Sequence, residues 1–297
     1  MQIGTLLPLG DIGGAPAVVT EYAEAAQSIG YDFVEAADHV LGVNAASRPG
    51  WDRNDNDDLF HDPFVLFGYL AGVTPKLGFS TGVLILAQRQ TALVAKQAAC
   101  LDALCGGRFR LGVGVGWNEV EYVGLNENFH NRGRRSEEQV QVMQKLWAEP
   151  HVKFEGRWHH IDDAGINPRP ESGKVPVWYG GHVDQTLQRV AKWGDGWMPN
   201  AYPPDQSALD VFARLRGLTE AAGRNPADIG IEVWTSMGAG SEADWNREAR
   251  FWKQAGVSHI CLTTTFDRRH HKRLAGHTLS DHIAALKRFH AAVADAL

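Results

Sequence analysis

The dipeptide Asp38-His39 is the clearest candidate for acid–base chemistry in this chain. It closes an apolar run that begins at Phe33, and a side chain at the end of a buried parallel strand points toward the mouth of an α/β barrel. Imidazole titrates near neutral pH, so His39 could move a proton or polarise a substrate oxygen. A histidine satisfied by hydrogen bonds in a packed loop is the competing interpretation, because the chain contains 13 histidines.

Glycine interrupts two successive apolar runs and leaves their backbone uncovered. One run contains Thr81-Gly82-Val83, and the next ends in Gly112-Val113-Gly114-Val115-Gly116-Trp117. Glycine at every second position removes the side chains from one face of a strand, so that face can accept either a planar ring or a neighbouring backbone. Gly82 within a β-branched run indicates a bulge or a close backbone approach. In both runs, tight packing inside the fold is the alternative.

A third glycine pair is suited to an anion. Gly180-Gly181-His182 follows an apolar run, and a helix is predicted to begin at Val183. Amide N–H groups at a helix N-terminus point along the positive end of the helix dipole and bind phosphate readily. The alternative is an ordinary turn between a strand and a helix.

The elements that must position these residues alternate between strand and helix. Apolar runs predict eight strands, which begin near Ile3, Phe33, Leu77, Arg108, Val175, Gly196, Ile229 and His259. Helical periodicity separates them, as in 183–192, 206–222, 242–254 and 281–296. Eight such units predict a single-domain (β/α)8 barrel over residues 1–297. An open doubly wound sheet ranks lower, because the first turn, residues 9–14, lacks the G-x-G-x-x-G spacing.

Two insertions interrupt the alternation, near residues 44–62 and 118–174. Both follow strand C-termini and would therefore lie over the active face of a barrel. The first is polar and is expected to close over the site. The second is predicted to hold one helix, 136–147, followed by loop from 149 to 174. Three tryptophans near predicted strand ends are expected to line a pocket: Trp117, Trp178 and Trp197.

Composition excludes several classes of function. The net charge of −6 argues against a nucleic-acid partner, and the apolar runs are too short for a membrane span. Three cysteines and no signal-peptide pattern predict a reducing, cytoplasmic location. No His-x-His pair occurs, and the adjacent pairs His159-His160 and His270-His271 are expected in solvated loops, so no metal is predicted.

Taken together, these segments resemble the bacterial luciferase-like superfamily of flavin and deazaflavin oxidoreductases, and most closely its F420-dependent branch. The matching segments are 30–39, 80–86, 95–108, 112–119, 132–133, 175–181 and 194–197. The resemblance implies a (β/α)8 barrel, a homodimer and a ring held over the strand C-termini. It also implies a cis peptide bond at Gly82–Val83.

Residue by residue, the resemblance places His39 near the reactive face, with Asp38 as its acidic neighbour. It places the cofactor on Thr81, Gly82, Val83, Gly114, Gly116, Trp117, Gly180, Gly181 and His182, of which the last three form the phosphate loop. Relatives that oxidise a sugar phosphate carry glutamate where this chain has Trp117, which argues against that substrate.

The expected function is hydride transfer between coenzyme F420 and a small organic substrate. Two alternatives stay open. The first is a monooxygenase of the same fold that uses FMN and oxygen, and the second is a protein that binds the cofactor without turnover.

Overall fold

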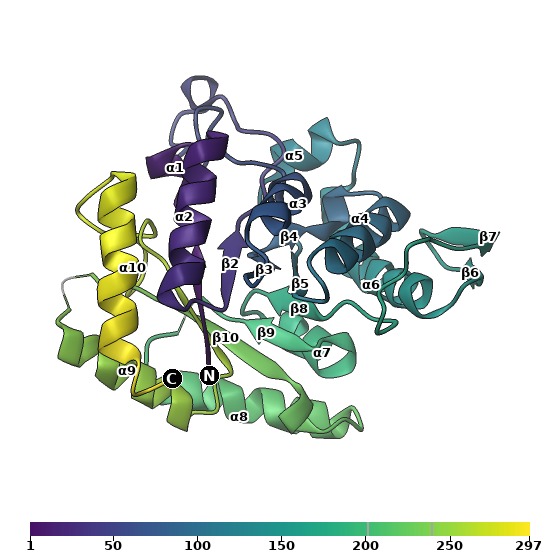
Figure 1. Cartoon of the computed structure of the whole chain (residues 1–297). Coiled ribbons are helices and arrows are strands. Elements are labelled where there is room, and N and C mark those ends of the chain that lie inside the picture. Colours follow the sequence, from purple (N-terminus) through teal and green to yellow (C-terminus); the bar gives the residue numbers. More distant parts are fainter. Residues whose placement is uncertain (201, 239) are drawn as a thin grey trace.

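Eight parallel strands close into a ring at the centre of this computed structural model, which describes residues 1–200, 202–238 and 240–297 (Figure 1). The ring closes where Phe79 of β3 pairs with Phe109 of β5. The (β/α)8 prediction is confirmed, and each strand begins within two residues of its predicted start. The strands are β1 Gln2–Leu6, β2 Phe33–Ala36, β3 Gly78–Thr81, β5 Phe109–Gly114, β8 Val177–Gly180, β9 Gly196–Met198, β10 Gly230–Thr235 and β11 His259–Leu262.

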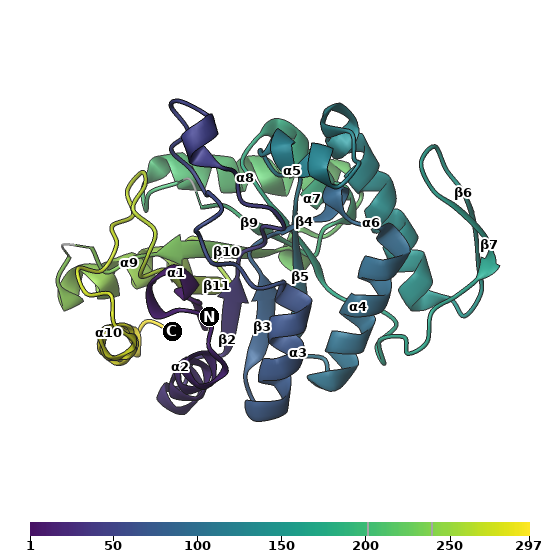
Figure 2. The same ribbon diagram turned by 90° about the horizontal axis from the view of Figure 1, so that it is seen from above.

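Helices surround the ring, as the view from above shows (Figure 2). They begin where the sequence supplies caps: Asp62 accepts hydrogen bonds from the amides of Phe64 and Val65 at the start of α3. Thr278 and Asp281 form a capping box at the start of α10. The main helices are α2 Pro16–Ile29, α3 Pro63–Val73, α4 Thr91–Leu104, α6 Arg132–Ala148, α7 Asp184–Trp193, α8 Gln206–Ala221, α9 Glu242–Gln254 and α10 Leu279–Val293.

The main hydrophobic core fills the space between the strands and the helices. Its largest fully buried side chains include Trp147, Trp197 and Trp252. Burial of a large apolar side chain contributes roughly 1.5–3 kcal/mol, so this layer supplies much of the stability that fixes the strand ends. Among the described residues, none of the helices combines the length and apolar character that a membrane span needs.

The inside of the barrel, in contrast, holds polar groups. The guanidinium of Arg110 lies 4.4 Å from the ring centre of Phe33 and 4.6 Å from that of Trp178. Trp178 therefore packs within the barrel and does not line a pocket, contrary to the prediction. Its ring also explains two glycines, because a Cβ at Gly196 or Gly230 would lie 2.2 or 2.3 Å from it.

The second insertion contains more regular structure than predicted. After α5 Glu119–Gly124 and α6, strands β6 Val152–Glu155 and β7 His160–Ala164 form an antiparallel hairpin. The prediction of loop over 149–174 was wrong here. The hairpin stands away from the barrel with most residues exposed or half-buried, so its sequence lacks the apolar run of a buried strand.

Candidate functional site

Two adjoining cavities open above the C-terminal ends of the strands. The larger, about 870 Å³, is lined by Arg53, Asn54, Trp117, Gly181, His182, Asn200 and residues 265–269. The smaller, about 330 Å³, has mixed walls, in which Leu7, Leu59 and Phe60 stand beside Asp11, Asp58 and Arg273. Asn54 and Thr265 line both. This face is where active sites of (β/α)8 barrels lie.

His39 is held by a buried carboxylate that the sequence analysis did not identify. Its Nδ1 lies 3.2 Å from Oε2 of Glu121 on α5, and Oε1 of Glu121 accepts hydrogen bonds from the amides of Val40 and Leu41. Burial raises the pKa of Glu121, but the hydrogen bonds from His39 and the two amides outweigh burial and lower that pKa overall. A carboxylate at Nδ1 fixes the ring orientation and leaves Nε2 for a ligand.

Aromatic rings connect His39 to both cavities. The His39 ring lies edge-on to Phe60 at 4.8 Å and to Trp117 at 6.0 Å. Trp117 in turn contacts Trp51, at 5.6 Å between ring centres, and lies under the guanidinium of Arg53 at 4.6 Å. Trp51, Arg53 and Phe60 all belong to the first insertion, which therefore covers part of the site.

Asp38 faces away from this wall. Its carboxylate accepts from Arg89, 2.7 Å to Nη2, and from the amide of Ile85 at 2.9 Å. Arg89 also donates to Asp62 at 2.9 Å. Arg89 thus connects Asp38, which precedes the first insertion, to Asp62, which ends the insertion and caps α3. Asp38 orients its neighbours, and a catalytic role for it stays a prediction.

The alternating glycines of β5 accommodate the neighbouring chain. A Cβ at Gly112 would lie 1.9 Å from the carbonyl oxygen of Thr81, and one at Gly114 would lie 2.5 Å from Cγ2 of Val83. A Cβ at Gly116 would lie 2.8 Å from Cγ2 of Ile85. Sequence analysis left open whether this face accepts a planar ring or neighbouring protein, and the structure shows neighbouring protein. The face of Gly114 and Gly116 is filled, and their contact with a cofactor stays a prediction.

The segment that fills this face has the predicted backbone geometry. The Gly82–Val83 peptide bond is cis, as the resemblance implied. The hydroxyl of Thr81 donates to the carbonyl of Gly112 at 2.7 Å, and Val83 also packs against Gly180. Val83 therefore forms part of the floor between β5 and β8.

The loop after β8 lies beside a cluster of cations. Gly181 has a φ of +112°, which favours glycine, and its carbonyl accepts from the indole of the buried Trp197 at 2.7 Å. Trp197 thus supports the loop and does not line the pocket. Arg269 lies 3.5 Å from Nε2 of His182 and 3.4 Å from Oδ1 of Asn200. Burial, and then the charge of Arg269, lower the pKa of His182.

Helix α7 begins directly after this loop without a side-chain cap, since Val183 occupies the cap position. Its first amides are thus available next to His182 and Arg269. The predicted phosphate seat therefore has a cationic side that sequence reasoning missed. The basic run 268–273 after β11 was the available signal, together with the rule that loops after barrel strands converge on one face.

The adjacent histidine pairs differ from expectation. His271 is buried, and burial followed by the nearby His270 lowers its pKa to about 4. His159 is half-buried and bonds Thr91 and Glu138, at 2.6 and 2.7 Å. Both were expected in solvated loops. Each is instead a packing histidine, because the loops after β11 and within the hairpin fold back onto the body of the protein.

Known proteins share the sequence pattern of this chain over most of its length. A family model described as luciferase-like monooxygenase matches residues 1–295. An uncharacterized protein of Mycobacterium tuberculosis is 34% identical over 218 residues, which cover 70% of this chain and 74% of that protein. A pyrimidine monooxygenase of Allorhizobium ampelinum is 31% identical over 210 residues, 65% of this chain and 55% of that protein.

Among solved structures, an F420-dependent secondary alcohol dehydrogenase in complex with an F420-acetone adduct is similar in fold. Its TM-score is 0.74 at 21% sequence identity, and the match covers 98% of each chain. At this identity the likeness concerns the fold alone.

Proposed function

The chain belongs to the luciferase-like monooxygenase family, and from this premise we propose that it transfers hydride between the deazaflavin coenzyme F420 and a small organic substrate. The observation that carries this proposal is the larger cavity, whose walls include three arginines, Arg53, Arg268 and Arg269, and one acidic residue, Asp267. Such an excess of cations suits a ligand with several negative charges. F420 carries a longer anionic tail than FMN, which favours the deazaflavin.

The residues fit such a coenzyme in distinct ways. The tail phosphate would bind the amides after Gly180 and Gly181, with His182 and Arg269 beside them. The ring would lie on the floor that Thr81, Gly82 and Val83 form, which Gly114 and Gly116 support from behind, next to the wall of Trp117. F420, when bound, supplies the hydride carrier.

The protein's own chemistry centres on His39. With Nδ1 held by Glu121, Nε2 of His39 is oriented to take a proton from a substrate hydroxyl or to return one. The smaller cavity beside Phe60 would hold the body of the substrate, with apolar contacts from Leu7 and Leu59 and polar ones from Asn54 and Thr265. Asp38 would keep the strand end in place through Arg89.

An FMN-dependent monooxygenase is the second candidate, and the similarity to a pyrimidine monooxygenase favours it. A cofactor-binding protein without turnover is the third. We further propose a homodimer, a small-molecule substrate and no nucleic-acid partner, in a cytoplasmic setting.

Reconstitution with each coenzyme tests the proposal. Purified protein is titrated with F420 and with FMN while ligand fluorescence is followed, and oxygen uptake is then measured with each reduced coenzyme. Tight binding of F420 with substrate-dependent reduction and no oxygen uptake is the expected result. Preferential binding of FMN with oxygen uptake would establish the second candidate, and binding without turnover over a panel of alcohols and carbonyl compounds would favour the third.

A further inference from the structure

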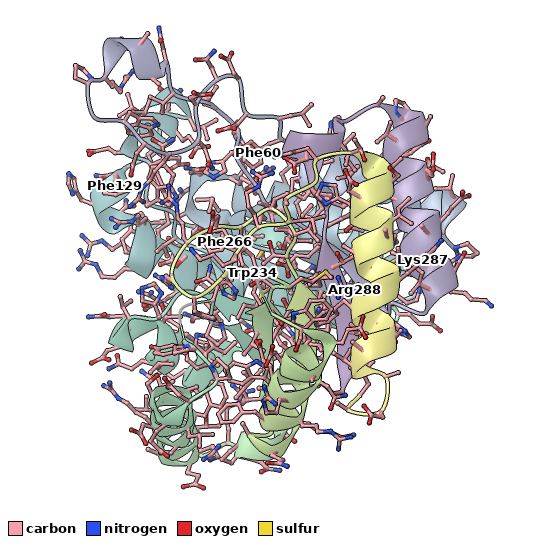
Figure 3. The ribbon with its side chains drawn as sticks, turned by 90° about the vertical axis from the view of Figure 1, so that its left-hand side faces the viewer. Phe60, Phe129, Trp234, Phe266, Lys287 and Arg288 are labelled. Atoms are coloured by element: carbon pink, nitrogen blue, oxygen red, sulfur yellow. The ribbon has the colours of Figure 1, made fainter. Side chains whose placement is uncertain are left out.

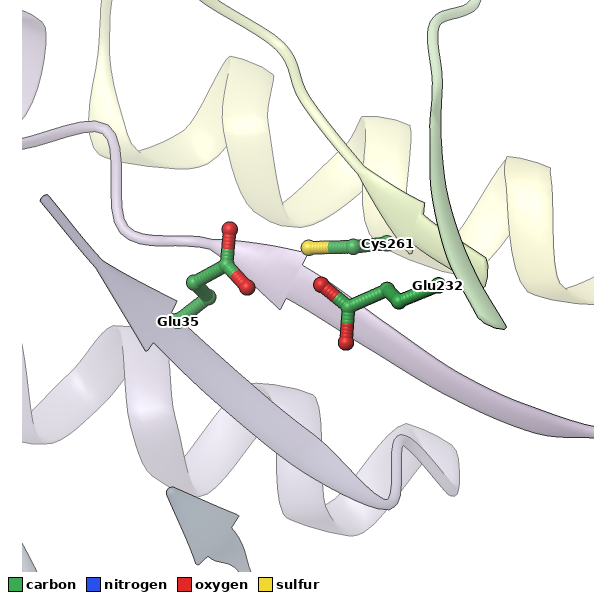
Figure 4. A group of neighbouring side chains, drawn as sticks. All are labelled: Glu35, Glu232 and Cys261. Atoms are coloured by element: carbon green, nitrogen blue, oxygen red, sulfur yellow. The ribbon is translucent and has the colours of Figure 1, made fainter. Parts of the chain in front are cut away.

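Two carboxyl groups meet inside the barrel, below the site. Glu35 on β2 and Glu232 on β10 are both buried, and one oxygen of each, together with Sγ of Cys261 on β11, lies within 4.8 Å of the others (Figure 4). Figure 4 shows the three side chains converging from separate strands. No other such group of three potential metal ligands occurs within 1–200, 202–238 and 240–297.

One cation faces this pair. Nη2 of Arg110 on β5 donates to Oε2 of Glu232 at 2.7 Å. Oε1 of Glu35 accepts from the indole of Trp234 at 2.9 Å. The remaining oxygens, Oε2 of Glu35 and Oε1 of Glu232, have no other partner although both are buried. One guanidinium balances one carboxylate, so a second buried negative charge would be left uncompensated.

A proton resolves this imbalance. Burial, and then the like charge of Glu232, raise the pKa of Glu35 well above its usual range. Burial also raises the pKa of the Cys261 thiol, which stays neutral. The charged and titratable groups around the pair are Arg110, Cys261 and His259, which is in register with Glu232. Burial, and then the charge of Arg110, lower the pKa of His259 to about 3, so it is neutral, and Trp234 and Ser80 are the uncharged neighbours.

Glu35 also touches two parts of the site. A Cβ at Gly82 would lie 2.1 Å from Oε1 of Glu35, so the carboxyl lies directly under the floor. The hydrogen-bond partner of Glu35, Trp234, contacts Phe266 at 5.2 Å between ring centres, and Phe266 lines the larger cavity. Figure 3 shows Trp234 and Phe266 next to each other.

We propose that Glu35 and Glu232 share a single proton, and that the protonated pair is a positioning device which holds Gly82 and Trp234 in place under the coenzyme. The part that concerns coenzyme rests on the proposed function. Ionisation of both carboxyls would separate them by repulsion, shift Gly82 and Trp234, and weaken coenzyme binding at high pH.

The test uses the full chain and the variants Glu35→Gln, Glu232→Gln and Glu35→Ala. Glu220→Gln, which alters an exposed carboxylate on α8, is the matched control. Three readouts need no coenzyme: the infrared band of a protonated carboxyl, the chemical shift of the Trp234 indole proton against pH, and thermal unfolding against pH. Coenzyme affinity over about pH 6 to pH 10 is the fourth.

The wild type should show the infrared band, and Glu35→Gln should lose it. The wild type should lose stability as pH rises from the ordinary carboxyl pKa of about 4.3 toward the raised one, because the folded state binds the extra proton. Glu35→Gln and Glu232→Gln should lack this slope and the matching shift of the Trp234 proton. Glu35→Ala should weaken coenzyme binding about tenfold near pH 6, because the Trp234 indole loses its acceptor, and the difference should narrow toward high pH as the wild type itself binds more weakly.

Three results would overturn the proposal: no protonated-carboxyl band in the wild type, a pH slope in Glu35→Gln as steep as in the wild type, or coenzyme affinity unchanged in Glu35→Ala. The comparison of slopes is needed because burial also raises the pKa values of Glu248 and Asp102. A stoichiometric divalent metal in the purified protein, whose removal destabilises the wild type and not Glu35→Gln, would also overturn it in favour of a metal centre. If no variant binds any coenzyme, the proposed function fails, and the three coenzyme-free readouts still decide whether the carboxyls share a proton.

Discussion

The carboxylate of Glu121 lies 3.2 Å from Nδ1 of His39, although 82 residues separate them in the chain. The same carboxylate binds the backbone amides of Val40 and Leu41. Helix α5 of the second insertion is therefore fastened to the end of β2, and any movement of α5 turns the His39 ring.

Replacement of His39 should abolish turnover and leave coenzyme binding intact. General acid–base catalysis contributes about 10²–10⁴-fold, so we expect His39→Ala to lower kcat by at least about a hundredfold. Coenzyme affinity, measured by fluorescence, should change little because the proposed tail site, at Gly181 and Arg269, does not include His39. His130→Ala, at an exposed histidine, serves as the control. Equal loss of affinity and turnover would place His39 in binding instead.

Glu121→Gln should reduce activity less than His39→Ala. It should also change how the unfolding free energy depends on pH at acidic pH. Because burial is outweighed by hydrogen bonds, the pKa of Glu121 is lowered in the folded state. Its stabilisation is then present above the ordinary carboxyl pKa, about 4.3, and is lost as pH falls through the lowered value. The difference in unfolding free energy between wild type and Glu121→Gln should shrink below about pH 4. A constant difference down to low pH would contradict this.

Arg269→Ala should weaken coenzyme binding through lost charge. A charge-assisted contact contributes about 1.5–3 kcal/mol, which corresponds to about a tenfold or larger rise in Kd. The effect should decrease with added salt, because exposed charges are screened. Arg247→Ala on α9, an exposed arginine away from the cavities, is the matched control. Identical behaviour of the two variants would exclude Arg269 from the tail site.

Gly114→Ala should destabilise the protein. The new Cβ would lie 2.5 Å from Cγ2 of Val83, so the floor must move, and we expect a loss of about 1–3 kcal/mol with weakened coenzyme binding. Gly217→Ala, within α8 and with no atom near the new Cβ, should stabilise the fold by about 0.5–1 kcal/mol. Thermal denaturation of both variants measures the contrast.

Val65→Arg should dissociate the expected homodimer. Val65 and Tyr69 are 71% and 44% exposed one turn apart on α3, and we place the expected interface at this pair. A buried interface would reject an unpaired arginine. Light scattering should show a dimer for the wild type and a monomer for the variant. A wild-type monomer would refute the dimer outright.

Most of the scaffold could be predicted because buried parallel strands produce short apolar runs, and these stand out from the helices between them. The hairpin β6–β7 could not, since Phe154 pairs with Ile161 among exposed residues. The interior of the barrel was also unexpected: Glu35 and Glu232 occur within otherwise apolar strands, and a single charged residue there does not reveal which strand faces it.

The candidate site was predicted from strand ends, and this rule named His39 and the loop at Gly181, which lie on the face where the two cavities open. It could not find Glu121 or Arg269, because both come from segments whose path over the barrel depends on long loops. The glycines of β5 show a different limit. Their spacing predicted a strand face without side chains. That Val83 packs against this face became clear only from the structure.

Arg89 binds Asp38, which precedes the first insertion, and Asp62, which ends it. The same arginine therefore fixes both ends of the segment between residues 38 and 62. Replacement of the sequence between these two aspartates is therefore expected to alter the wall of the proposed substrate site while the end of β2 and the start of α3 stay in place.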